Sequence, residues 1–130
     1  MSAPEDFVAA YEEAAMWSST DNSREDGGDP LDNGTYELSE KTRAVMRKDC
    51  DTFFDANGML LALATCKRGT GQYSKNAQAG HDFWLTRNGH GAGFWDGDWS
   101  KPHGEALTAA CKKFREFYLY VGDDGKVYGE

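Results

Sequence analysis

The stretch His81-Asp-Phe-Trp-Leu-Thr-Arg-Asn-Gly-His-Gly-Ala-Gly-Phe-Trp-Asp96 gives the strongest indication of how this chain folds. Residues 81–87 and 92–96 are rich in aromatic side chains, which favour strands. Between them lies Asn88-Gly89, a dipeptide typical of the tight turn of a β-hairpin. We therefore expect two short antiparallel strands here, with alternate side chains on opposite faces.

A second hairpin is predicted nearer the C-terminus. Residues 117–121 and 126–128 are strand-like and flank Gly-Asp-Asp-Gly at 122–125. The two hairpins would join into one antiparallel sheet of about four strands. Such a sheet has two open edges, so a homodimer through an exposed strand edge is compatible with it.

The N-terminal part has the spacing of helices. Apolar residues recur at helical intervals as far as Trp17, and Ser2 with Glu5 has the pattern of a capping box. A second helix is predicted to begin near Leu38 or Ser39, the latter suited to an N-cap, and to stop at Asn57-Gly58.

The remaining segments complete the predicted fold. The apolar run 59–65 is expected to be a third, buried helix, and 73–80 a loop with one helical turn begun by Ser74. A helix over 103–114 would cross one face of the sheet. Because helices and strands segregate along the chain, the predicted class is α+β, in a single domain spanning residues 1–130.

The charge of the chain is strongly asymmetric. Its 130 residues carry a formal net charge of −8. Residues 1–58 hold 14 acids and 5 bases, whereas residues 59–130 hold 8 acids and 9 bases. This balance argues against general nucleic-acid binding and against an anionic membrane surface, because both demand a basic face. No apolar run approaches the roughly 20 residues that span a bilayer.

The acidity suggests a candidate interaction surface. Residues 18–36 form a long acidic loop that is expected to be either functional or poorly ordered. One interpretation is a set of solvated faces; the other is a surface that meets a basic partner. The candidate residues for that surface are Glu12, Glu13, Asp26, Asp29 and Asp32.

The 81–96 segment is also the densest cluster of chemically useful side chains. Its aromatic rings could stack on a flat ligand, its arginine could meet an anion, and its glycines could let the backbone approach. The alternative is that the same rings form the core of the sheet. The candidate pocket residues are His81, Asp82, Trp84, Arg87, His90, Trp95 and Asp96.

Motifs for catalysis or metal binding are weak. The histidines lack metal-ligand spacing, and Cys50, Cys66 and Cys111 are too far apart for a zinc or redox motif. His90 with Asp96 or Asp82 could form an acid–base pair, but no nucleophile motif accompanies them. We therefore expect no cofactor and no metal, and enzyme activity stays uncertain, with the balance against it.

The 81–96 segment resembles a group of small, uncharacterised bacteriophage proteins. The stretch Tyr118-Leu-Tyr-Val-Gly-Asp-Asp-Gly-Lys-Val-Tyr128 is similar to the way those proteins end. The group has no established activity, so the resemblance implies only a context, that of a phage product in the cytoplasm of its host.

The sequence is compatible with three functions. The first is a non-enzymatic accessory protein that binds a host protein, in host takeover or against host defences. The second is a small-ligand or nucleotide-binding protein, or an enzyme, that uses the 81–96 segment. The third is a component of the virion.

Overall fold

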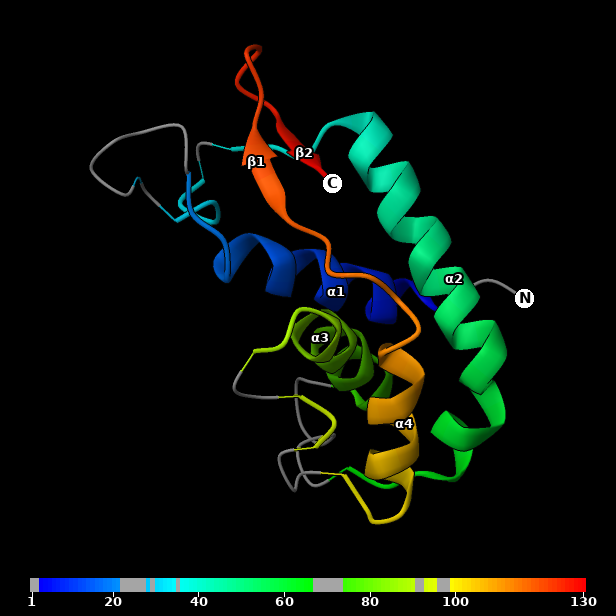
Figure 1. Cartoon of the computed structure of the whole chain (residues 1–130). Helices are drawn as coiled ribbons and strands as arrows, with labels where there is room; N and C mark the ends of the chain where they lie inside the picture. Colours follow the sequence, from blue (N-terminus) through cyan, green and yellow to red (C-terminus); the bar gives the residue numbers. More distant parts are fainter. Residues whose placement is uncertain are drawn as a thin grey trace.

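The computed structural model describes residues 3–21, 28, 30–34, 36–66, 74–90, 93–95 and 99–130. Within these residues the chain forms four helices followed by a two-stranded antiparallel sheet (Figure 1). The elements are α1 (Glu5–Trp17), α2 (Glu40–Leu63), α3 (Lys75–Arg87), α4 (His103–Cys111), β1 (Leu119–Val121) and β2 (Val127–Gly129). The α+β class is confirmed, but the sheet in the described residues has two strands where four were expected.

The prediction of a first hairpin is wrong, because residues 81–87, its expected first strand, form the C-terminal part of α3. Ser74 caps this helix: its side chain accepts a hydrogen bond from the backbone N–H of Ala77 at 3.0 Å. At the other end the backbone N–H of His90 donates to the carbonyl oxygen of Leu85 at 3.0 Å, and that of Gly89 to Thr86 at 3.2 Å. This pair of bonds is the Schellman motif that ends helices.

Asn88-Gly89 ends a helix here and does not form the turn of a hairpin. The φ of +71° at Gly89 is left-handed backbone, which glycine adopts readily at the end of a helix. The same freedom serves a tight hairpin turn, so the dipeptide alone does not distinguish the two structures. The alternation of side chains between two strand faces, expected for residues 81–87, is replaced by a helix buried on most sides.

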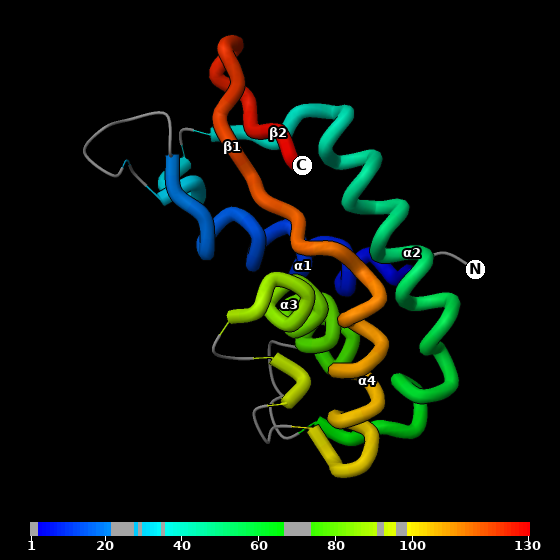
Figure 2. Tube along the Cα trace, viewed as in Figure 1, coloured from blue at the N-terminus to red at the C-terminus, as the bar shows by residue number. Residues whose placement is uncertain are grey.

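Helix α3 is the centre of the helical part, packed between α1 and α4 (Figure 2). Gly80 permits its close approach to α1. A methyl group at this position would lie 2.0 Å from the backbone oxygen of Phe7, well inside van der Waals contact. The chain can therefore bring the two helix backbones together only because residue 80 has no side chain.

Helix α2 differs from the prediction at its C-terminal end. Asn57-Gly58 does not stop the helix: Asn57 has non-helical angles (φ −123°, ψ 16°) and marks a kink, after which the helix runs on to Leu63. The run 59–65 is thus no separate buried helix, and Met59 and Leu63 are exposed. The N-cap prediction is confirmed, since Ser39 accepts from the backbone N–H of Thr42 at 3.1 Å.

The two remaining helices are shifted slightly from expectation. Helix α1 is preceded by Pro4 as its N-cap, without a side-chain capping bond, and Ser2 lies outside the described residues. Helix α4 ends at Cys111, short of 114, and packs against α2 and α3 where a crossing of the sheet was predicted. No helix in the described part of the chain has the length and apolarity to cross a membrane.

Aromatic rings fill the space between the helices. The rings of Phe53 and Phe83 stack with centroids 4.2 Å apart, which joins α2 to α3. Phe7 and Tyr11 of α1 and Phe94 pack around this pair. Such aromatic pairs contribute about 0.5–1.5 kcal/mol each beyond the area they bury. The rings of the 81–96 segment that were candidates for a ligand pocket therefore belong largely to the core.

The second predicted hairpin is present. In its ladder Leu119 lies opposite Gly129, Tyr120 opposite Tyr128 and Val121 opposite Val127. The outer edge of β2 is covered by residues 37–39: Val127 donates to Glu37 at 2.8 Å and accepts from Ser39 at 2.9 Å. The hairpin thus lies over the N-terminal end of α2 and projects above α1 (Figure 1).

Candidate functional site

The six candidate pocket residues that the structure describes do not meet at one cavity. Arg87 and Asp82 are buried in two separate polar networks, while Trp84 and His90 line a surface cleft. Trp95 is exposed, and Asp96 lies outside the described residues.

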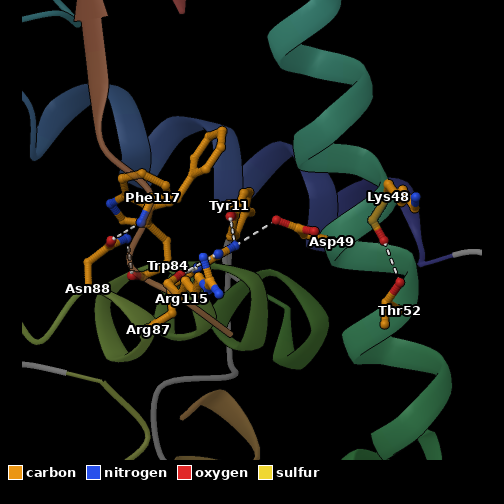
Figure 3. A network of polar contacts seen from close by, with 9 residues as sticks. All are labelled: Tyr11, Lys48, Asp49, Thr52, Trp84, Arg87, Asn88, Arg115 and Phe117. Carbon is orange, nitrogen blue, oxygen red and sulfur yellow. Dashed lines mark hydrogen bonds and ion pairs between the residues drawn. The ribbon is translucent and has the colours of Figure 1, made fainter. Parts of the chain in front are cut away.

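Arg87 joins three other segments of the chain in the interior (Figure 3). Its Nη1 donates to the hydroxyl of Tyr11 in α1 at 3.0 Å and to Oδ2 of Asp49 in α2 at 2.8 Å. Its Nε donates to the backbone oxygen of Arg115 at 2.9 Å, and Nη2 donates to the same oxygen. The guanidinium also lies 5.4–5.6 Å from the ring centroids of Phe83, Phe114 and Phe117.

This geometry makes Arg87 a fold-stabilising residue. All three nitrogens of its guanidinium already donate to partners inside the protein, so an anionic ligand would compete with these bonds. Burial raises the pKa of the Tyr11 hydroxyl above its usual range, although the positive charge of Arg87 works in the opposite direction. Tyr11 is therefore a neutral partner of the arginine at physiological pH.

Asp82 is the centre of the second network. Its Oδ2 accepts from the indole Nε1 of Trp99 at 2.6 Å, and its Oδ1 accepts from Gln78 Nε2 at 3.0 Å. The Nδ1 atom of His81 also lies 3.0 Å from Oδ1. The carboxylate can thus orient the imidazole, as the second member of an acid–base pair does. This is a different pairing from His90 with Asp82 or Asp96.

His81 lies apart from the cleft that contains Trp84 and His90. Its ring stacks on Trp17 of α1, with centroids 5.9 Å apart. Together with the bond to Asp82, this stacking fixes the imidazole against the helix surface. The arrangement stabilises the contact between α1 and α3.

The cleft has a volume of about 300 Å³ and lies between three segments that are distant in sequence. One wall is Ser18–Thr20, the second comprises Trp84, Asn88 and His90, and the third is the extended chain Phe117–Leu119. Trp84 anchors it, with its indole N–H donating to Ser18 Oγ at 2.8 Å. Asn88 holds the third wall, because its Oδ1 accepts from the backbone N–H of Phe117 at 2.8 Å (Figure 3).

The chemistry of this cleft suits hydrogen bonding and stacking more than anion binding. Its described lining offers hydroxyls, an amide, an imidazole and aromatic rings, but no lysine or arginine. A nucleotide phosphate would find no cationic partner there. Within the described residues, no three His, Cys, Asp or Glu side chains gather as they would around a metal ion.

Comparison of the chain with protein-family models, with curated proteins and with solved structures found no match. The interpretation of the surface therefore rests on its geometry.

The candidate acidic surface is placed in part. Glu13 and Asp32 are exposed, Glu12 is half-buried, and Asp26 and Asp29 lie outside the described residues. Glu12 and Glu13 line a surface groove of about 210 Å³ together with Glu37, which the sequence did not single out. We call this groove, lined by Glu12, Glu13, Met16, Tyr36, Glu37, Leu38 and Arg43, the acidic groove.

Charges in the acidic groove are unbalanced. Arg43 is the one cation in its described lining, and it pairs with Glu12 at 3.5 Å. Burial raises the pKa of Glu12, while Arg43 and Arg47 act to lower it. Glu13 and Glu37 remain as exposed carboxylates beside the apolar side chains of Met16 and Leu38. Two exposed carboxylates on one surface suit a basic partner, whereas Leu38 is buried and Met16 only half-buried, so the groove offers little apolar surface.

The three cysteines lie in separate parts of the fold. Cys50 and Cys111 are buried and Cys66 is half-buried, and no disulfide joins these three residues. Burial raises the pKa of the Cys50 and Cys111 thiols well above their usual range, which keeps them protonated. Neither of these two cysteines has the low-pKa, accessible setting of a nucleophile.

Sequence reasoning also missed an exposed tyrosine cluster on the hairpin. Tyr118 and Tyr120 are 59% and 41% exposed, and Tyr120 stacks on Tyr128 across the ladder with centroids 6.0 Å apart. Tyr128 donates from its hydroxyl to Asp124 Oδ2 at 2.7 Å. The alternation of tyrosine with leucine and valine was the signal, because residues two apart on a strand share a face.

Proposed function

We propose that this chain is a small phage accessory protein that acts in the host cytoplasm by binding a host protein, without catalysing a reaction. The single observation that carries the proposal is the convergence of Glu12, Glu13 and Glu37 on one groove with a single arginine. Opposite charge steers two proteins together and fixes their register. The bacteriophage context comes from the resemblance of residues 81–96.

The internal use of Arg87 and Asp82 supports this proposal over the ligand-binding alternative. Arg87 was the anion-binding candidate, and its donors are occupied by Tyr11, Asp49 and Arg115. Trp84 and His90 still line a cleft, so the ligand-binding alternative now applies to a small uncharged ligand.

The proposal is tested by capture from a bacterial lysate with matched charge variants. Glu13→Gln with Glu37→Gln removes two exposed carboxylates of the acidic groove. Asp55→Asn with Glu105→Gln removes two exposed carboxylates elsewhere, with the same change of net charge. Mass spectrometry should identify a protein that the wild type and the second variant retain and the first variant loses.

Two results would contradict the proposal. If both variants retain the same proteins as the wild type, the acidic groove is no binding surface. If the chain is recovered within purified phage particles and captures no host protein, the virion role applies instead.

A further inference from the structure

The outer edge of β1 presents backbone groups that have no hydrogen-bond partner among the residues that the structure describes. Tyr118 and Glu130 exchange two backbone bonds at 2.8 and 3.0 Å, and Gly122 donates to Lys126 at 2.8 Å. Bonded pairs alternate along an antiparallel ladder, so the backbone groups of Leu119 and Val121 point away from β2. Among the described residues nothing pairs with them.

The two edges of the sheet differ in this respect. Residues 37–39 pair with the outer edge of β2, whereas β1 has no such cover in the described chain. An unpaired strand edge is a template for another extended chain, and peptide recognition by strand addition uses such edges. Peptide backbone bonds would supply affinity, and neighbouring pockets would supply specificity.

A suitable pocket lies at the start of this edge. The cleft between Ser18–Thr20 and Phe117–Leu119 adjoins β1 at Leu119. Its volume of about 300 Å³ is enough for one large side chain of a bound peptide. Tyr118, which is exposed, belongs to the lining of this cleft, and tyrosine is enriched among the residues that dominate binding energy.

The charge of the hairpin favours a basic peptide as the partner of the open edge of β1. The hairpin segment 116–130 contains the acids Glu116, Asp123, Asp124 and Glu130 but only one base, Lys126. A second copy of this chain would bring together two hairpins with the same excess and two chains of net charge −8. A peptide that carries lysine or arginine has the complementary charge.

We propose that an extended, basic peptide segment of the partner adds as a strand to the open edge of β1, with one large side chain in the adjoining cleft. This inference rests on the proposed function and specifies the mode of binding. It places the contact on the β1 edge of the hairpin, whereas the acidic groove joins the hairpin at the opposite edge, through the bridge between Leu38 and Val127.

The probe is a synthetic eight-residue peptide that alternates valine and lysine, added to the full chain. Its control is the peptide that alternates valine and glutamate. Amide hydrogen exchange is followed by nuclear magnetic resonance. The lysine peptide is expected to slow exchange at Leu119 and Val121 by about tenfold or more, because their N–H groups gain partners. Tyr120, already paired with Tyr128, should change less.

Two variants at one position test the geometry. Val121→Pro removes the outward N–H, at a site where an edge strand tolerates proline because that group is outside the ladder. Val121→Thr keeps the N–H and a similar shape. Binding of the lysine peptide should be lost in the first and kept in the second. If Val121→Pro disturbs the hairpin, the exchange pattern of the wild type decides alone.

Three results would overturn the inference. The first is that the lysine peptide changes the amide signals of the acidic residues but does not slow exchange at Leu119 and Val121. The second is no response to the lysine peptide, or an equal response to the glutamate peptide. The third is slower exchange at these amides that grows with protein concentration alone, which would indicate a second copy.

The capture experiment separates this inference from the proposed function. If Val121→Pro retains the host protein that Glu13→Gln with Glu37→Gln loses, strand addition is wrong and the acidic groove remains the binding surface. If no host protein is captured by any variant, the proposed function itself fails.

Discussion

Replacing Arg87 with methionine is expected to lower the free energy of unfolding by about 3–5 kcal/mol, the usual cost of removing one member of a buried charge network. Methionine fills similar space but leaves Asp49, the Tyr11 hydroxyl and the carbonyl oxygen of Arg115 without their donor. Hydrogen bonds to a charged group contribute about 1.5–3 kcal/mol each. The Asp49 side chain is 26% exposed, so water replaces part of the hydrogen bonding that it loses. The expected loss of unfolding free energy is therefore smaller than the sum of the individual hydrogen-bond contributions.

Urea unfolding followed by circular dichroism measures this loss. A typical domain is stable by about 5–15 kcal/mol, so the variant should fold but unfold at much lower urea. Arg87→Lys is the matched control because it keeps the charge and loses the planar fork that reaches several partners. It is expected to recover only part of the stability.

A double-mutant cycle with Asp49→Asn isolates the ion pair. Residues in direct contact show coupling energies of about 0.5–3 kcal/mol, and Arg87 with Asp49 should lie in this range. A loss below about 1 kcal/mol for Arg87→Met, or an Arg87→Lys variant as stable as the wild type, would refute the structural role and reopen Arg87 as a ligand-binding residue.

Three further substitutions test the packing and the electrostatics. Gly80→Ala should lower the free energy of unfolding by about 3 kcal/mol or more, because its methyl would meet a backbone oxygen of α1 at 2.0 Å. Its control, Gly58→Ala, has open space around it and should be neutral or stabilising. Equal urea midpoints of the two variants would contradict this. Trp99→Phe removes the donor to Asp82 and should cost about 1.5–3 kcal/mol, and an unchanged thermal midpoint would show that the bond contributes nothing. Glu12→Gln should stabilise the chain at neutral pH, because burial raises the pKa of Glu12 and its ionisation is therefore disfavoured by folding. That gain should vanish as the pH falls below the unfolded pKa of about 4.3, where both proteins are neutral at this position; a gain that grows toward acid would contradict the sign.

Local signals were sufficient for much of the fold. Ser39 was recognised as an N-cap because its hydroxyl bonds three residues ahead, within reach of sequence reasoning. The C-terminal hairpin was recognised because Gly-Asp-Asp-Gly between strand-like runs specifies a turn by itself. At the turn Asp124 accepts from the backbone N–H of Lys126 and from Tyr128, bonds that hold its pKa below the usual range.

The error at residues 81–87 has a physical origin. Helix α3 is buried on most sides, so it lacks the polar face that would reveal a helical period. Ala79, Phe83 and Arg87 do recur every four positions, but the aromatic content dominated the interpretation. Asn88-Gly89 then fitted both a hairpin turn and a helix end, and only packing against α1 decided between them.

The site was less predictable because its parts come together only in three dimensions. The cleft joins residues near 18, 88 and 118, and no local pattern connects them. Glu37 joins Glu12 and Glu13 only because residues 37–39 pair with β2. The sequence predicted acidity in the right half of the chain but could not say which carboxylates share a surface.

We propose that this chain binds a protein partner electrostatically at the acidic groove. The most direct test is the dissociation constant of the captured host protein for the wild type and for Glu13→Gln with Glu37→Gln, at low and at physiological salt. Weaker binding by the variant is expected at low salt, with a difference that shrinks as salt screens the charges. Equal affinity of both proteins at low salt would contradict it.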